Sequence, residues 1–270
     1  MKEFIQKHKL FSFYTALMLV IVFIAIFAPW LAPGDAFTSD MSKALQAPST
    51  QHWFGTDKLG RDVLSRIIYG TQLSLFMGVS IVVIMVSIGT IIGAVAGYFG
   101  GKIEMVLMRL ADIMLSFPGV VLAIAIAGIL GGSIVNTIIA LSVVGWAKYA
   151  RLVRSMTLKV RGEEYVTAAV MMGASTTTIL RRHIIPNILP LVVTTGALDI
   201  GPTRIEVAGL SFLGFGAQPP TPEWGLMLNE GRQYLQTSPW LMAFPGMSIL
   251  IVVAIFNLWS DSLRDVVDPK

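Results

Sequence analysis

Residues 75–97 read LFMGVSIVVIMVSIGTIIGAVAG, a stretch without one charged side chain. About 20 consecutive apolar residues are enough for a helix to cross the hydrocarbon core of a membrane. The whole chain of 270 residues shares this character, because 54% of its residues are hydrophobic and only 13% are charged. A soluble domain usually carries about 25% charged residues. The composition therefore predicts a polytopic membrane protein and excludes a disordered chain, a disulfide scaffold and a nucleic-acid-binding module.

Five further apolar segments are candidates for membrane-spanning helices. They are residues 10–28, 108–130, 131–147, 184–203 and 241–260. Val and Ile are frequent in several of them, which raises the alternative of β-strands. Open strands do not occur in lipid, and the strands of membrane barrels run about 10 residues, so this alternative is rejected. The predicted fold is all-α, a bundle of about six transmembrane helices.

Basic residues predict the orientation of the chain in the membrane. Residues 10–28 follow Lys2, Lys7 and Lys9, but they are longer than a signal-peptide core and lack a small-x-small cleavage site. We therefore interpret them as an uncleaved first span. With the N-terminus in the cytoplasm, 14 of the 20 Lys and Arg residues fall in inside segments. This bias predicts that both termini are cytoplasmic and explains the net charge of +4 without a nucleic-acid partner.

The predicted spans divide the chain into two parts. Residues 1–74 would hold the N-terminal transmembrane helix and an external segment, and residues 75–270 the remaining spans. The second part includes a long basic cytoplasmic loop at residues 148–183 and an external stretch rich in Gly and Pro at residues 204–240.

The cytoplasmic loop contains a pattern that predicts two short helices meeting at a glycine. Glu163 suits the positive N-terminus of the first helix. Gly173 permits a sharp exit from that helix, and Ser175 is a suitable N-cap for the next one. A small apolar face would be formed by Ala168, Ala169 and Met172. Such a knob can enter a groove on a soluble partner; the simpler alternative is a solvated basic loop.

This loop resembles the EAA loop of ABC importer permeases. In that motif, acid-Ala-Ala is followed by three residues, a glycine, nine residues and a short apolar stretch that ends in proline. The residues that fit this spacing are Ala168, Ala169, Gly173 and Pro186. Thr167 stands where the family often has Glu, and His183 stands where it has Ile. The variant is similar to that of the peptide/nickel branch of the family.

Three other stretches resemble the same branch. Residues 55–66 resemble its external segment after the first helix, residues 214–225 its external loop before the last helix, and residues 256–269 its C-terminal end. Residues 52–269 are thus similar to ABC transporter permeases of the dipeptide/oligopeptide/nickel family.

The resemblance implies a permease subunit of an importer in the bacterial inner membrane. It would pair with a second, homologous permease, while two ABC ATPase subunits bind the EAA loops and an extracytoplasmic solute-binding protein delivers the substrate. The chain has no Gly-x4-Gly-Lys-Ser/Thr phosphate loop, so we expect it to bind no cofactor, with ATP and Mg used by the partner subunits. The expected ATPase-coupling residues are Glu164, Tyr165, Thr167, Ala168, Ala169, Gly173, Ser175, Arg182 and Pro186.

Charged residues within or beside the spans are candidates for the translocation path, because exposing a charge to lipid is costly. These candidates are Asp199, Arg204 and Glu206. Asp199 either lines the path or pairs structurally, with Arg204 or with a partner helix. Residues 146–151 and 198–201 look more like nickel-type members, which favours nickel or a nickel chelate over di- or oligopeptides as substrate. No set of metal ligands is identified, because the three His residues form no pair at ligand spacing.

Two local patterns predict helix contacts. Asp112 follows Arg109 at i+3, which predicts an ion pair within one helix near the cytoplasmic interface. Gly89, Gly93 and Gly97 form a small-xxx-small series, which predicts a close helix contact within this subunit or with the partner permease.

An intramembrane enzyme and a passive channel are the alternative functions. An enzyme needs a convergent nucleophile and base, or a metal. The sequence has no Gly-x-Ser-x-Gly, no His-Glu-x-x-His and no cysteine, so no catalytic residue is assigned. A passive channel gives no reason for the large cytoplasmic loop.

Overall fold

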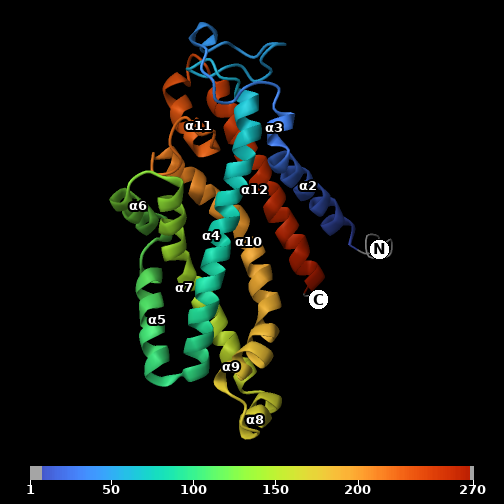
Figure 1. The fold of residues 1–270 in the computed structure, drawn as a ribbon, viewed down its shortest axis with the longest axis vertical. Coiled ribbons are helices and arrows are strands. Elements are labelled where there is room, and N and C mark those ends of the chain that lie inside the picture. Colours follow the sequence, from blue (N-terminus) through green and yellow to red (C-terminus); the bar gives the residue numbers. More distant parts are fainter. Residues whose placement is uncertain (1–7, 268–270) are drawn as a thin grey trace. The chain divides into compact units, whose positions relative to one another are not determined.

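The computed structural model describes residues 8–267, and its regular structure is helical (Figure 1). The first elements are α2 (Lys9–Ile26), α3 (Ala28–Leu31), η1 (Met41–Lys43), α4 (Val63–Phe99), α5 (Gly101–Ser116), α6 (Gly119–Leu130) and α7 (Ile134–Arg161). They are followed by α8 (Glu164–Met171), α9 (Thr176–Ile179), η2 (Leu180–Ile184), α10 (Ile185–Phe212), α11 (Trp224–Gly231), η3 (Arg232–Tyr234) and α12 (Trp240–Val267). Across residues 8–267 the β pairing is limited to one isolated bridge, between Thr56 and Asp62. The predicted all-α fold is confirmed.

Four helical segments of the described chain are long and apolar enough to cross a membrane. They are α2, α4, the continuous run from α9 to α10, and α12; α5 and α6 together give a fifth. This is roughly the predicted number of about six. The helix that holds the span predicted at residues 131–147 is α7, which is not among these segments. It continues to Arg161 because nothing in the following basic sequence interrupts a helix.

Several helices extend beyond the apolar segments that predicted them. α4 begins at Val63, twelve residues before the predicted span at residues 75–97, and α10 continues to Phe212. Residues 204–212, predicted as part of an external loop, are therefore helical. Lys2, Lys7 and Lys270, which contributed to the predicted orientation, lie outside the described residues.

The span predicted at residues 108–130 consists of two helices. α5 and α6 meet at a bend of 92°. Phe117 between them is extended, with φ −98° and ψ 149°. Pro118 explains the break, because proline disfavours the helical conformation in the residue before it and lacks the N–H that a continuous helix needs.

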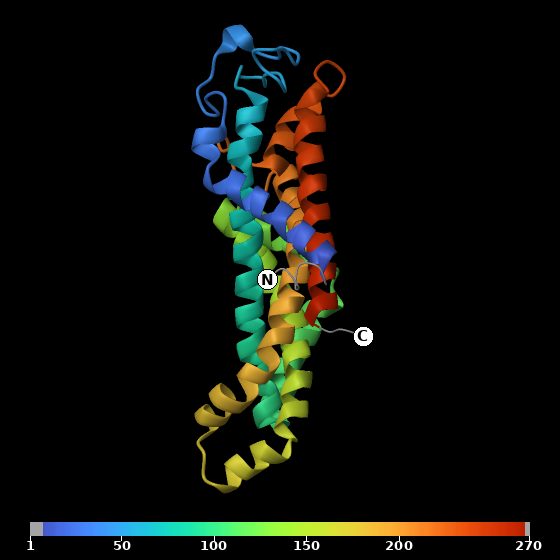
Figure 2. The same cartoon turned by 90° about the vertical axis from the view of Figure 1, so that its right-hand side faces the viewer.

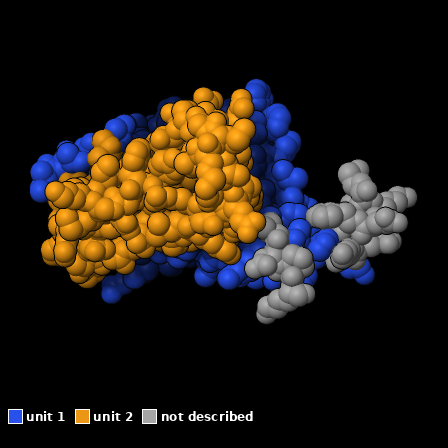
Figure 3. All heavy atoms as spheres, turned by 90° about the horizontal axis from the view of Figure 1, so that it is seen from below, with its two compact units in different colours: residues 1–80, 127–138, 198–270 blue, residues 81–126, 139–197 orange. Residues whose placement is uncertain are grey.

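The chain separates into two compact units, which Figure 3 colours differently. Unit 1 comprises residues 1–80, 127–138 and 198–270, and unit 2 comprises residues 81–126 and 139–197. In unit 1, α12 packs against both α2 and α11 (Figures 1 and 2). The core of unit 1 includes Ile21, Val63, Ile67, Trp224, Leu241 and Phe256. The core of unit 2 includes Ala94, Val153, Val166, Ile179, Ile184, Ile188 and Val192.

Three glycines bring the backbones of α4 and α7 together in unit 2. A Cβ atom on Gly93 would lie 2.5 Å from the carbonyl oxygen of Ala150 and 2.7 Å from the Cβ of Val153. Gly89 and Gly97 face α7 at similarly short distances. The predicted close helix contact is confirmed, and it lies within this chain.

The replacement Gly93→Ala is expected to destabilise the protein by about 1–3 kcal/mol, because overpacking a tight contact costs this much. The obstacle is a backbone oxygen, which cannot rotate away as a side chain can. Gly209→Ala on α10 is the matched control, since no atom lies within 4 Å of the added Cβ. That variant should be neutral or more stable by up to about 1 kcal/mol. Thermal unfolding in detergent measures both, and equal melting temperatures would contradict the packing argument.

Candidate functional site

The helix–glycine–helix elbow predicted in the cytoplasmic loop is present in unit 2. Its helices α8 and α9 are in contact, and a loop joins them (Figure 2). α8 begins after Glu163, and Glu164 lies in its first turn. Gly173 has a φ of +79°, a conformation that residues other than glycine rarely adopt. Ser175 caps α9, because its Oγ accepts a hydrogen bond of 3.3 Å from the backbone N–H of Thr178.

The inner side of the elbow is fixed to the core of unit 2. Val166 and Ile179 are buried in that core, one from each helix of the elbow. Tyr165 is held from the other side, because its hydroxyl accepts a hydrogen bond of 3.2 Å from Asn187 Nδ2. The ring of Tyr165 also lies 6.0 Å from that of His183. α8 is therefore a braced element rather than a loose loop.

The outer side of the elbow exposes apolar side chains. Met171 and Met172 are 83% and 87% exposed, and Val170 is 51% exposed. Of the expected small face, Ala168 is exposed and Ala169 is partly buried. Consecutive exposed methionines form an adaptable apolar surface. We name Val170, Met171 and Met172 the apolar tip. Val170 and Met171 were not predicted to be part of it, although adjacent methionines in a short helix cannot both face one core.

The remaining expected coupling residues surround this tip or follow it. Glu164, Tyr165, Thr167, Ser175, Arg182 and Pro186 are all exposed. Behind them, Leu180–Ile184 forms a π-helical turn, η2, which leads directly into α10. The predicted coupling residues from Glu164 to Ser175 thus lie at the elbow, whereas Arg182 lies in η2 and Pro186 at the start of α10.

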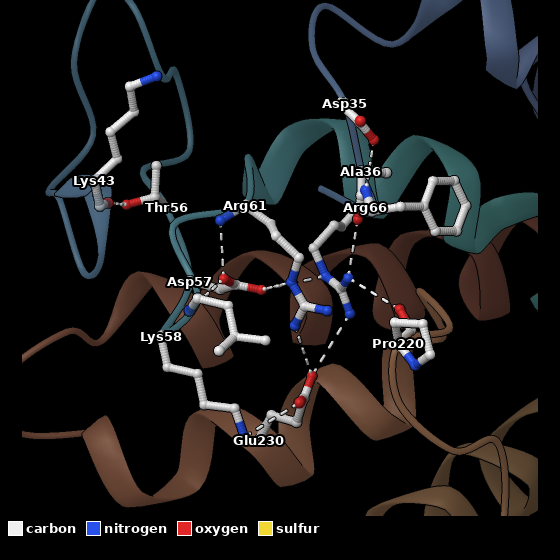
Figure 4. A network of polar contacts seen from close by, with 12 residues as sticks. Asp35, Ala36, Lys43, Thr56, Asp57, Lys58, Arg61, Arg66, Pro220 and Glu230 are labelled. Carbon is white, nitrogen blue, oxygen red and sulfur yellow. Dashed lines mark hydrogen bonds and ion pairs between the residues drawn. The ribbon is translucent and has the colours of Figure 1, made fainter. Parts of the chain in front are cut away.

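A second site, in unit 1, is a buried network of charges that the sequence analysis did not foresee (Figure 4). Arg61 and Arg66 are almost completely buried. Arg61 Nε donates to Asp57 Oδ2 at 2.7 Å, and Nη2 of each arginine lies 3.5 Å from Glu230 Oε2. Lys58 adds a contact of 3.2 Å to the other oxygen of Glu230. The network joins the loop before α4 to α11.

Backbone contacts complete this network. Arg66 Nη1 donates to the carbonyl oxygens of Ala36 at 3.0 Å and Pro220 at 3.2 Å, as Figure 4 shows. Arg66 thus fastens two more loops to the same point. Residues 55–66 attracted notice in the sequence only through their resemblance to a family. In the structure they contain Asp57, Arg61 and Arg66, whose contacts hold the loops of unit 1 together.

The three predicted path residues have different environments on α10. Asp199 and Glu206 are partly exposed, whereas Arg204 is buried. The guanidinium carbon of Arg204 lies 5.2 Å from the centre of a Trp224 ring, and Trp224 Nε1 donates to the carbonyl oxygen of Ile67 at 3.0 Å. Arg204 therefore lies within the packing between α10 and α11.

Glu223, next to this tryptophan, caps α11. Its carboxylate accepts hydrogen bonds from the backbone N–H groups of Gly225 at 3.1 Å and Leu226 at 2.9 Å. Burial raises the pKa of the Glu223 carboxyl above its ordinary value, and the two hydrogen bonds and the charge of Arg204 oppose that rise.

The ion pair predicted between Asp112 and Arg109 is wrong. Asp112 Oδ1 instead contacts Arg151 on α7, with distances of 3.2 Å to Nε and 2.5 Å to Nη2. Two guanidinium nitrogens of Arg151 contact the same oxygen of Asp112, so the partner comes from the facing helix α7 and not from the preceding turn of α5. Residues 8–267 contain no group of three or more His, Cys, Asp or Glu that could hold a metal ion.

Comparison with known proteins gives matches along nearly the whole chain. Residues 89–270 match the family described as "binding-protein-dependent transport system inner membrane component". Residues 5–48 match the "N-terminal TM domain of oligopeptide transport permease C".

Two relatives are equally similar to this chain. The dipeptide transport system permease protein DppC of Alkalihalophilus pseudofirmus is 44% identical over 266 residues, covering 98% of this chain and 88% of that protein. The glutathione transport system permease protein GsiD of Escherichia coli O6:K15:H31 is 44% identical over 270 residues, covering 100% and 89%. An inward-facing structure of the MetNI methionine ABC transporter has the same fold, with a TM-score of 0.53 and 19% identity, over 72% of this chain and 94% of that one.

Proposed function

This chain belongs to the inner-membrane components of binding-protein-dependent transport systems, in the dipeptide/oligopeptide group of ABC permeases, and we propose that it imports short peptides. It would form half of the translocation pathway beside a second, homologous permease. Two ABC ATPase subunits would supply the energy, using ATP and Mg, and an extracytoplasmic solute-binding protein would supply the substrate. The observation that carries the proposal is the 44% identity to two peptide permeases across almost all of the chain.

The elbow in unit 2 is proposed as the contact with the ATPase subunits. Its apolar tip is exposed, and its inner side is packed into the core of unit 2. This arrangement suits an element that transmits a movement of the ATPase subunits to the helices of the permease. The proposed coupling residues are Glu164, Tyr165, Thr167, Ala168, Ala169, Gly173, Ser175, Arg182 and Pro186. This assignment places the elbow and both termini on the cytoplasmic side, as the distribution of Lys and Arg favours.

Peptides are favoured over nickel as the substrate because two relatives are named for a dipeptide and for glutathione. Nickel or a nickel chelate stays the second candidate, on the likeness of residues 198–201 to nickel-type members. Asp199 and Glu206 are the proposed path residues, since both are partly exposed on α10. For Arg204, which is buried against Trp224, we propose that it supports the path by holding α11 in place.

Uptake in a strain that lacks the gene tests the proposed function. Accumulation of labelled dipeptide or glutathione should fall at least tenfold in this strain, and the restored gene should reverse the loss. Nickel and nickel-chelate accumulation, measured in the same cells, should not change. Loss of nickel accumulation alone would assign the metal as substrate, and no loss of any of these would overturn the proposal.

A further inference from the structure

A hollow of about 540 Å³ lies between α5 and α7 in unit 2. It is lined by Gly101, Glu104, Met105, Met108 and Asp112 from α5 and by Arg151 and Arg154 from α7. The positions on α5 follow a spacing of three or four residues, so they form one face of that helix. The volume falls within the range of about 300–1,000 Å³ that is usual for small-molecule sites.

Two acid–arginine pairs cross this hollow. Asp112 pairs with Arg151, and their side chains are 48% and 52% exposed. Glu104 pairs with Arg154, whose Nε lies 2.7 Å from Glu104 Oε1, and their side chains are 20% and 37% exposed. Both pairs thus remain accessible from the hollow.

Charges this exposed do not face lipid, because a charged side chain in contact with hydrocarbon is costly and such residues turn towards water or a protein partner. Ion pairs that are open to water also contribute little to stability. The arginine and the carboxylate of each pair can therefore separate and bind opposite charges on a ligand at a small cost in free energy.

The geometry points to this hollow as a site for the zwitterionic backbone of a short peptide on its way through the permease. This inference rests on the proposed function. It adds four residues to the proposed translocation path that were not predicted from the sequence, namely Glu104, Asp112, Arg151 and Arg154. Asp112 and Glu104 would take the terminal ammonium group, and Arg151 and Arg154 would take the terminal carboxylate, for which a guanidinium fork is well suited. Met105 and Met108 supply an apolar wall that adapts to different side chains, as a transporter of varied peptides requires.

The absence of cysteine from the chain makes the hollow directly testable. We expect Met108→Cys, in the complete transporter in inside-out vesicles, to react with a water-soluble thiol reagent at least tenfold faster than Ala111→Cys. Ala111 is the matched control because it lies on the same helix, α5, and is completely buried. Saturating dialanine should slow the labelling of Met108→Cys several-fold, whereas N-acetyl-dialanine amide, which has no charged terminus, should not.

A paired neutral variant separates binding from folding. The double variant Asp112→Asn, Arg151→Gln removes one pair without leaving an unpaired charge, so the transporter should still assemble. Placed in the Met108→Cys chain, it should raise the dialanine concentration needed for protection at least tenfold.

Two results would overturn the inference while leaving the proposed function intact. One is equal labelling at the two cysteines, as expected if a partner helix fills the hollow; the other is protection by dialanine that the double variant does not change. Failure of the unmodified transporter to take up dialanine would overturn the proposed function, and this inference with it.

Discussion

Replacing Gly173 by glutamate is expected to reduce substrate uptake at least tenfold while the protein still inserts into the membrane. The φ of +79° at this position is unfavourable for most residues with a Cβ, glutamate among them, by roughly 1–2 kcal/mol. No atom lies within 4 Å of an added Cβ, so the effect does not come from a clash inside the chain. Instead, the turn between α8 and α9 changes, and a charge is added beside the apolar tip where the ATPase would dock.

Gly173→Asn is the matched control for this prediction, because asparagine tolerates the left-handed conformation and adds no charge. It should retain most of the uptake. Uptake of labelled peptide and substrate-stimulated ATP hydrolysis by the purified complex are the two measurements. If Gly173→Glu transported at the normal rate, the proposed role of the elbow would be wrong.

Replacing Glu230 by alanine is expected to destabilise the protein by about 3–5 kcal/mol, the usual cost of breaking a buried ion pair from one side. Among residues 8–267, Asp57 would then be the carboxylate left in contact with the guanidinium groups of Arg61 and Arg66. Both arginines are only 1% exposed. The loops that meet in this network should therefore loosen from α11.

Lys58→Ala is the control for the loss of charge at the same network, because the Lys58 side chain is 37% exposed. An exposed ion pair is worth about 0–1 kcal/mol, so this variant should melt close to the parent. Thermal unfolding of the detergent-purified protein compares the two. A Glu230→Ala protein that is as stable as Lys58→Ala would show that the network is not a support.

Most of the fold follows from local sequence. Long uncharged stretches such as residues 75–97 predict helices because a membrane leaves few other structures available to them. Their ends are harder to predict, since α4 and α10 continue through polar residues that pack against protein instead of lipid. Pro118 was visible in the sequence, but the angle of 92° between α5 and α6 was not predicted from it.

The two sites differ in how far the sequence reveals them. The elbow is built from local signals, namely an acidic first turn, Gly173 and the cap at Ser175, and its geometry was predicted. The pairs Asp112–Arg151 and Arg66–Glu230 join residues that are far apart in the chain. No spacing rule reports such contacts, which is why Asp112 was assigned to its sequence neighbour Arg109.

The π-helical turn at Leu180–Ile184 decides where this stretch can lose a residue. A turn of this kind holds one residue more than an α-helical turn, so deleting one residue within it leaves an ordinary helical turn, and the later residues keep their orientation. Ile184, Ile188 and Val192 recur at every fourth position and are all buried in unit 2. Deleting one residue between Ile184 and Ile188 would instead rotate everything that follows by about 100°, so that a different side of the helix would face that core. The turn thus tolerates a change in length that the helix after it does not.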